Sequence, residues 1–337
     1  MTAVSLTPAG PFSLAASVHF LEGFTPASYS GTADEVLRLA FPADDGHSTV
    51  AAAVRQEETA DDEAGTIRAE FTVHPGEPDG DLDGTPADPA SAGAVSAGPG
   101  PLCAGEPSWP DEAVRAQLAR ILSLDVDGSG FPELAAADPV VAGLMAEFPG
   151  LRPVCFHSPY EAAVWAVIGH RIRMPQAAAI KARLAERYGR RVQIAGRTLH
   201  AFPTPPVLRA ITRVPGLTEV KIERLHALAE AADAGALDAA RLRAMPGDDA
   251  LAALRTLPGI GPFSAELILI RGAGHPDVFP RHERRLHAAI AAAYGLDETA
   301  SGDIGRLAGI ADGWRPYRSW IAFLLRVRAE HIGRHVS

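Results

Sequence analysis

The spacing of apolar and polar residues changes once along the chain. In residues 1–74 the apolar residues form short runs, and Ile67, Ala69, Phe71 and Val73 alternate with their neighbours. A period of two is typical of a strand that buries one face. The pattern therefore predicts a small α+β domain of roughly four or five strands at this end of the chain.

From Asp111 onward the apolar residues recur at the spacing of one helix face. Ser158 precedes a proline and begins one helix, and Glu161 completes a capping-box pattern with it. The helix behind them is apolar on nearly every side, which places it in a core. Residues 111–337 are therefore predicted to form a mainly all-α domain of about ten helices. Further helices are expected at residues 217–235, 248–256, 263–271, 282–294 and 317–333.

Residues 75–110 join these two parts and consist of Gly, Pro, Ala, Ser and Asp with almost no large apolar side chain. Such a composition buries too little apolar surface to offset the entropy of ordering the chain. This segment is therefore predicted to be an acidic linker or insertion.

The distribution of charge changes what the net charge of −10 implies. Acidic residues greatly outnumber the three bases of residues 1–110, whereas residues 251–337 hold 11 arginines against 8 acids. Such asymmetry is compatible with a phosphate-facing surface in the C-terminal part, and also with a solvated helical surface. Charge alone therefore leaves nucleic-acid binding open.

Several classes of protein and of site are excluded by composition. No apolar stretch is long enough to cross a membrane. The first residues lack the basic and apolar regions of a signal peptide, so we expect a cytoplasmic location. Cys103 and Cys155 are too few for a four-cysteine zinc or iron–sulfur site. We therefore expect no cofactor.

The most informative segment, Leu257-Pro258-Gly259-Ile260-Gly261, lies between two helical patterns within residues 254–271. The proline ends one helix, and the glycines allow a left-handed backbone and close approach of another molecule. The first N–H groups of the next helix then face outward, where they can hold a phosphate. On its own, the segment is also compatible with an ordinary turn between two helices.

A second block, Asp277 to Glu283, follows the hairpin and reads DVFPRHE. Together the two blocks resemble the helix-hairpin-helix plus Gly/Pro-Asp (HhH-GPD) motif of the DNA glycosylase superfamily, in particular its 3-methyladenine DNA glycosylase II (AlkA) type. Other segments look like that type in the same order: FPGLRP from Phe148, SPYEA from Ser158, FPTP from Phe202 and WRPYRS from Trp314. Residues 12–74 look like its N-terminal α+β domain.

The resemblance implies a fold, an activity and a partner. The fold is an α+β N-terminal domain followed by a mainly all-α helix-hairpin-helix glycosylase domain. The activity is that of a monofunctional DNA glycosylase in base-excision repair, which hydrolyses the N-glycosidic bond of a flipped-out alkylated purine of the 3-methyladenine type. The partner is double-stranded DNA that contains damaged bases, and the protein is expected to be a monomer.

The resemblance also assigns roles to residues. The catalytic aspartate of the family falls on Glu283, whose carboxylate would stabilise the oxocarbenium-like sugar. Glu283 is also compatible with a helix-start residue favoured by the helix dipole, and Asp277 is a second carboxylate that more often caps a loop. The residues expected to bind DNA are Leu257, Pro258, Gly259, Ile260, Gly261, Phe263 and Ser264.

The expected base pocket departs from the family. Its aromatic positions fall on Phe263, which is aromatic, and on Leu267 and Arg326, which are not. Aromatic faces attract cationic alkylated bases, so this loss weakens the case for 3-methyladenine. Arg171, with Ile172 beside it, falls on the residue that wedges into the gap left by the flipped base, although an arginine at a helix end is also compatible with a solvated surface.

Two further expectations follow from the family's chemistry. The glycosylase-lyases of the superfamily need a lysine just after the hairpin for a Schiff base, but Phe263 stands there, and the chain has only Lys181 and Lys221. We therefore expect no lyase activity. The resemblance also implies a structural Na⁺ or K⁺ held by the backbone carbonyls of Arg255, Leu257 and Gly259.

Glu283 and the reduced number of pocket aromatic residues keep a second function open. The chain could be a catalytically inactive or altered helix-hairpin-helix protein that binds DNA and senses lesions, because glutamate replaces the catalytic aspartate. Glutamate carries the same charge but is longer by one methylene, and a displacement of about an ångström can cost roughly a hundredfold in rate.

Overall fold

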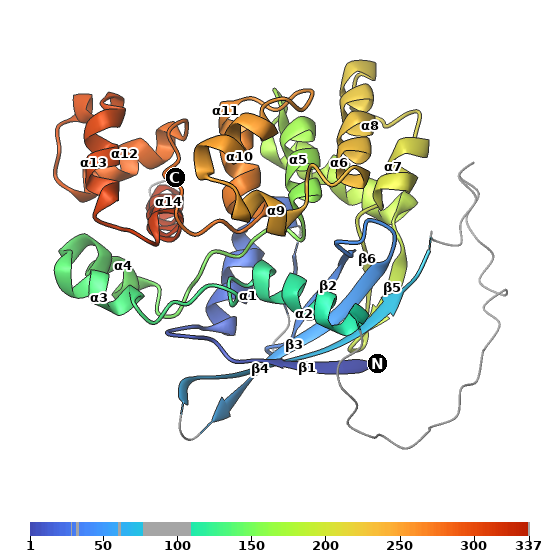
Figure 1. Cartoon of the computed structure of the whole chain (residues 1–337), viewed down its shortest axis with the longest axis horizontal. Helices are drawn as coiled ribbons and strands as arrows, with labels where there is room; N and C mark the ends of the chain where they lie inside the picture. Colours follow the sequence, from blue (N-terminus) through green and yellow to red (C-terminus); the bar gives the residue numbers. More distant parts are fainter. Residues whose placement is uncertain (28, 32–33, 60–61, 77–108, 336–337) are drawn as a thin grey trace.

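The computed structural model describes residues 1–27, 29–31, 34–59, 62–76 and 109–335. A four-stranded antiparallel sheet lies on one side of the molecule, and most of the helices form a broad layer on the other side (Figure 1). Most of the segment that we predict to be an acidic linker, residues 77–108, lies outside the described residues.

The N-terminal part is the α+β unit that the alternating pattern predicts. Its strands are β1 (Thr2–Leu6), β2 (Leu37–Pro42), β3 (Thr49–Thr59) and β4 (Asp62–His74), and they pair in the order β1-β4-β3-β2. Ile67, Ala69 and Phe71 of β4 are buried, as expected of the inward face of a strand. Helix α1 (Leu14–Gly23) and the short 3-10 helix η1 (Thr25–Ala27) follow β1. Leu14 and Leu21 of α1 belong to the same core as the sheet.

A helix that follows residues 77–108 in the chain also contributes to the core of this unit. Helix α2 (Trp109–Ile121) contributes Val114, Leu118 and Ile121 to the cluster that contains Phe41 and Phe71 of the sheet. A helix that buries its apolar face against the sheet fixes the position of the chain where it leaves this unit. The start of the helical part is therefore fixed relative to the sheet.

The rest of the chain is mostly helical, as predicted. The helices are α3 (Phe131–Ala137), α4 (Pro139–Glu147), α5 (Pro159–Gly169), α6 (Met174–Tyr188), α7 (Pro205–Ala210), α8 (Glu219–Asp233), α9 (Ala239–Ala244), α10 (Gly247–Leu254), α11 (Pro262–Leu267), the π-helical η2 (Ile268–Gly272), α12 (Arg284–Ala293), the 3-10 helix η3 (Glu298–Gly302), α13 (Ile304–Asp312) and α14 (Arg318–His335). They pack in two groups. One core surrounds α5, and the other joins α3 and α4 to α12, α13 and α14. In the part of the chain that the structure describes, no helix is both long and apolar enough to cross a membrane.

Helix α5 is the centre of the larger core, as its apolar sequence predicts. Nine of its eleven residues are buried. Ser158 caps it, because its hydroxyl oxygen accepts a hydrogen bond from the N–H of Glu161 at 3.1 Å. The other half of the expected capping box is wrong: the Glu161 carboxylate pairs with Lys181 at 2.6 Å and His157 at 2.8 Å. Tertiary ion pairs are stronger partners for a buried carboxylate than one backbone N–H.

A two-stranded sheet interrupts the helices where the sequence pattern did not predict strands. β5 (Arg191–Ile194) pairs with β6 (Arg197–His200) in antiparallel register. Val192 and Ile194 are buried and pack on Ala51 and Ala53 of the large sheet. Each strand has only four residues, so its alternation is too short to be distinguished from a loop in the sequence.

Candidate active site

The predicted hairpin connects α10 to α11 on the face of the helical layer that points away from the sheet (Figure 1). Ile260 is buried in the core around α5, and Leu257 packs against that core. Pro258, Gly259 and Gly261 are exposed at the turn. The apolar residues of the motif therefore anchor the turn, and its small residues face outward.

The two glycines of the hairpin have different roles. Gly259 has φ +85°, a left-handed conformation, and a Cβ added to it would lie 2.8 Å from Cδ of Arg224. Gly261 has φ −90° and ψ −179°, an extended conformation open to any residue, and a Cβ there would meet no described protein atom within 4 Å. The expectation of a left-handed backbone thus holds for Gly259 and is wrong for Gly261. Space at Gly261 is available to another molecule.

A cavity of about 250 Å³ lies beside the hairpin and brings together four of the predicted site residues. Phe263 and Leu267 come from α11, Glu283 from the residue before α12, and Arg326 from α14. Phe263 is 46% exposed, which is unusual for a phenylalanine. Phe263 therefore belongs both to the cavity lining and to the outer surface beside the hairpin.

The carboxylate of Glu283 is partly buried at this cavity, with 23% of the side chain exposed. Glu283 is the N-cap residue of α12, but its side chain makes no capping hydrogen bond. Its nearest cation is Arg326, whose Nε lies 3.7 Å from Oε1 and whose guanidinium also bonds Glu330 at 2.7 Å. The glutamate therefore presents a carboxylate to the cavity rather than closing the end of its helix.

The cavity is more aromatic than the sequence predicts. Phe20 reaches it from α1, Phe24 from the residue that follows α1, Phe156 from the segment before α5, and Trp165 from α5 itself. The rings of Phe20 and Phe24 stack with centroids 5.2 Å apart. A lone tryptophan in the largely apolar helix α5 was the available signal for Trp165. The other rings come from segments far from the motif in the sequence, so no local pattern could reveal them.

A partly buried cation lies among the aromatic rings. The guanidinium of Arg271 lies 5.2 Å from the ring centre of Phe20, 4.8 Å from that of Phe24 and 4.9 Å from that of Phe323. Its Nε donates a hydrogen bond to the carbonyl of Val154 at 3.0 Å. Burial lowers the pKa of Arg271 to about 10, so it stays charged at neutral pH. The aromatic faces that it occupies are held in place by this contact.

Other candidate residues lie elsewhere. Asp277 binds Arg318 at 2.7 Å and Arg315 at 3.2 Å and does not line the cavity. These two ion pairs make it a structural carboxylate that ties the loop before Glu283 to the start of α14.

Arg171 and Ile172 line a separate open hollow with Lys221 and Arg224. Arg171 has φ +56°, a strained conformation for a residue with a side chain. The ammonium of Lys221 donates to the carbonyls of Ile168 at 2.8 Å and His170 at 2.7 Å, which fixes the loop before Arg171. Because Arg224 also lies against Gly259, this hollow adjoins the hairpin.

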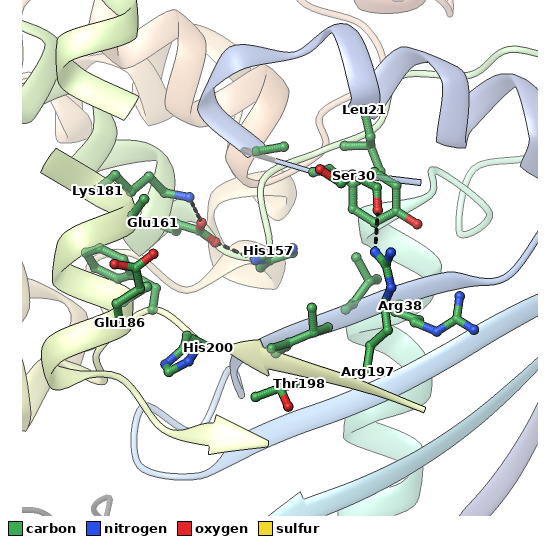
Figure 2. A pocket seen from close by; sticks show the side chains of 18 residues that line it. Leu21, Ser30, Arg38, His157, Glu161, Lys181, Glu186, Arg197, Thr198 and His200 are labelled. Carbon is green, nitrogen blue, oxygen red and sulfur yellow. Dashed lines mark hydrogen bonds and ion pairs between the residues drawn. The ribbon is translucent and has the colours of Figure 1, made fainter. Parts of the chain in front are cut away.

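A second cavity, of about 320 Å³, lies between the large sheet, α6 and β6, and holds none of the predicted site residues. Figure 2 shows the Glu161 carboxylate between Lys181 and His157 at its edge. Burial opposes ionisation of Glu161, but the interactions with His157 and Lys181 outweigh it, so the pKa of Glu161 lies well below its ordinary value. The carboxylate of Glu161 is therefore already paired with Lys181 and His157.

Known DNA glycosylases and a DNA repair enzyme resemble this chain in sequence or in fold. No protein-family model matches the chain. A DNA-3-methyladenine glycosylase of Bacillus subtilis is 26% identical over 221 residues, which are 64% of this chain and 72% of that protein. A probable bifunctional transcriptional activator/DNA repair enzyme AlkA of Mycobacterium tuberculosis is 33% identical over 225 residues, 64% of this chain and only 42% of its own length. The solved structure of a 3-methyladenine DNA glycosylase from Archaeoglobus fulgidus has a TM-score of 0.69 at 20% identity and covers 98% of both chains.

Proposed function

We propose that this chain, which shares its sequence pattern and fold with the helix-hairpin-helix DNA glycosylases of the 3-methyladenine glycosylase II type, removes alkylated bases from duplex DNA in base-excision repair. One observation carries the proposal. The carboxylate of Glu283 lies at an aromatic-lined cavity that is large enough for a base and adjoins an exposed hairpin.

Different parts of the site carry out different steps of the proposed reaction. The exposed hairpin turn around Gly261 holds the DNA backbone, and the damaged base rotates out of the duplex into the cavity. The bond between C1′ and the base nitrogen breaks, and its electron pair leaves with the base. The Glu283 carboxylate stabilises the positive charge that develops on the sugar. A water oxygen then adds to C1′, and Glu283 is placed to accept the proton that this water loses.

The aromatic lining supports an alkylated base as the substrate. Alkylation at a ring nitrogen makes the base in DNA cationic, and the faces of Trp165, Phe156 and Phe263 attract such a base. Trp165 and Phe156 thus take the place of the aromatic residues that were expected at Leu267 and Arg326. We propose a purine of the 3-methyladenine type as the substrate.

The positions of the two lysines support a hydrolase without lyase activity. Phe263 stands at the position just after the hairpin. Lys181 is bound to Glu161 and to the Pro26 carbonyl, and Lys221 is bound to two carbonyls of the loop before Arg171. Neither lines the cavity of Glu283, so neither amine is placed to attack C1′. The test is strand cleavage at the product site, which we expect to be absent without added base.

The alternative of a DNA-binding lesion sensor without chemistry is not favoured by the names of the relatives, which describe glycosylases and a repair enzyme. The expected Na⁺ or K⁺ at the hairpin stays a proposal. The Leu257 carbonyl accepts a hydrogen bond from the N–H of Ile260 at 3.1 Å, and its second lone pair could bind an ion together with the carbonyls of Arg255 and Gly259. The monomeric state and the cytoplasmic location remain predictions.

The decisive experiment is release of 3-methyladenine from methylated duplex DNA by the wild type and by Glu283→Gln. The amide keeps the shape of the side chain but removes its charge, so binding should persist while base release falls by about two orders of magnitude. If neither protein releases a base from alkylated, deaminated or oxidised duplexes, the glycosylase assignment fails.

A further inference from the structure

A second buried glutamate connects the helix after the hairpin to the loop that carries Glu283. Glu266 lies on α11, three residues after Phe263, and is 3% exposed. Its Oε1 accepts a hydrogen bond from the N–H of Arg281 at 2.9 Å, and its Oε2 accepts one from the N–H of His282 at 3.1 Å. The Nδ1 atom of His282 lies 2.7 Å from Oε1 of the same carboxylate. One carboxylate therefore holds two consecutive residues next to Glu283.

Burial of the Glu266 carboxylate is costly unless both of its oxygens accept hydrogen bonds. A carboxylate taken out of water needs its lone pairs satisfied, and here both oxygens are satisfied by the segment 281–282 alone among the described hydrogen bonds. Hydrogen bonds between a carboxylate and N–H groups are among the stronger ones in proteins. The loop consequently has one favoured position relative to α11.

The neighbouring side chains of His282 and Glu283 have different surroundings. His282 is 50% exposed and does not line the cavity, whereas the next residue, Glu283, does. The imidazole is thus held outside by Glu266, and the backbone turns at that point so that Glu283 faces inward. The Glu283 side chain makes no capping bond to α12, and only its backbone carbonyl is held by that helix, through the N–H of His287 at 3.1 Å. Its position therefore depends on the residues before it as well as on the start of α12.

We infer that Glu266 is the residue that positions the catalytic carboxylate and ties its place to the docked hairpin; this inference rests on the proposed glycosylase function. The hairpin turn, α11 and Glu266 are consecutive in the chain, and the bonds from Glu266 lead directly to the residues before Glu283. A phosphate held at the turn and the sugar to be attacked on the same strand are then set at a fixed separation from Glu283. Glu266 also lines the cavity, but both of its carboxylate oxygens are bound to residues 281 and 282, so it acts through Glu283 and not on the substrate.

The test is a double-mutant cycle in single-turnover excision from methylated duplex DNA, with DNA affinity measured in parallel. Glu266→Ala should slow base release by about a hundredfold, the effect expected of a misplacement of about an ångström, while affinity changes less than about threefold. Glu266→Gln, which can still accept one of the bonds, should lie between. In the Glu283→Gln background, Glu266→Ala should cause no further loss, because the group that it positions is gone.

Glu161 of α5 provides a matched control. Like Glu266 it is a buried glutamate, and it is ion-paired with Lys181 at the cavity in Figure 2. Glu161→Gln should lower the melting temperature but leave the rate of the folded protein unchanged. If Glu266→Ala lowers the rate by the same factor in the wild-type and Glu283→Gln backgrounds, or no more than Glu161→Gln does, the positioning role is refuted.

A measurement without substrate separates this inference from the proposed function. Hydrogen exchange of the amides of residues 281 and 282 should be slow in the wild type and in Glu283→Gln. It should be at least tenfold faster at both amides in Glu266→Ala and at one of them in Glu266→Gln, which keeps a single acceptor oxygen. Unchanged exchange in both Glu266 variants would overturn the inference even if the wild type is active. An inactive wild type with the expected exchange pattern would overturn the glycosylase assignment and leave the clamp on the loop established.

Discussion

The guanidinium of Arg326 lies 3.7 Å from the carboxylate of Glu283, so part of the negative charge at the cavity is compensated by the protein itself. Arg326 also bonds Glu330 at 2.7 Å on the same helix. Both members of the Arg326–Glu283 pair are about one-fifth exposed, and water therefore screens the attraction only in part. In the proposed reaction, the charge available to a developing sugar cation would depend on this arginine.

Replacement of Arg326 by glutamine should raise the rate of release of a cationic alkylated base. The neutral side chain keeps most of the volume and no longer competes for Glu283, and a gain of about 1 kcal/mol corresponds to roughly a fivefold increase in rate. The measurement is single-turnover release of 3-methyladenine. A neutral substrate base in the same assay is the control, and a slower reaction with both bases would show that Arg326 orients Glu283 instead.

Replacement of Glu283 by aspartate tests whether the cavity is built for the longer side chain. The shorter carboxylate withdraws by about an ångström, so we expect a rate well below that of the wild type and above that of Glu283→Gln. DNA affinity should stay the same in all three proteins. A variant with aspartate that is faster than the wild type would show that the cavity is shaped for the aspartate of the family.

Substitution of each hairpin glycine by alanine should have a different effect. Gly261→Ala places a methyl group where no described protein atom lies within 4 Å, so the free energy of unfolding should change by less than about 1 kcal/mol. Duplex affinity should nevertheless fall at least fivefold, at matched salt, because the methyl group keeps the DNA backbone away. Full affinity in Gly261→Ala would contradict the contact between this turn and DNA.

Gly259→Ala should instead act on the folded protein. Its φ of +85° is unfavourable for alanine, and the new Cβ would lie 2.8 Å from Arg224. We expect a loss of stability of about 1–2 kcal/mol, measured by urea unfolding. The comparison of the two glycine variants separates loss of fold from loss of DNA contact.

The buried Glu161 makes stability depend on pH. Burial opposes its charge, but His157 and Lys181 lower its pKa below the unfolded value. A lowered folded pKa contributes stability that is fully present above the unfolded pKa of about 4.3 and is lost as the pH falls below it. Melting temperature should therefore drop on acidification below about pH 5.

Lys181→Met should remove much of this dependence and lower stability by about 3–5 kcal/mol at pH 7, because it leaves a buried carboxylate without one partner. Lys181→Arg, which keeps the charge, is the control. If Lys181→Met melts at the wild-type temperature at pH 7, the ion pair contributes little to the fold.

The sequence could predict the parts of the site that depend on local pattern. The hairpin, the strand through Ile67 and Phe71, and the central position of α5 follow from short-range spacing. Phe263, Leu267, Glu283 and Arg326 were assigned by resemblance to the glycosylases, and they line one cavity.

What could not be predicted depends on contacts between distant segments. Glu161 fits a capping box by spacing, yet Lys181, twenty residues away, takes its carboxylate. Glu266 stands alone as an acid in an apolar stretch, which signals a buried partner but does not name it. Its partners, Arg281 and His282, become neighbours only when α11 and the loop pack together. Spacing along the chain cannot resolve which of several donors a buried acid will meet.

The aromatic residues at the end of α1 and just after it affect how this protein can adapt. Phe20 and Phe24 belong to the part of the chain that precedes the sheet strands β2–β4, while Glu283 and the hairpin lie more than two hundred residues later. The shape of the cavity is thus inherited from one region and its chemistry from another. In the proposed glycosylase, substitutions at Phe20 and Phe24 would change which base fits, whereas the hairpin and the Glu283 carboxylate come from another region of the chain. The range of substrates could then evolve separately from catalytic power.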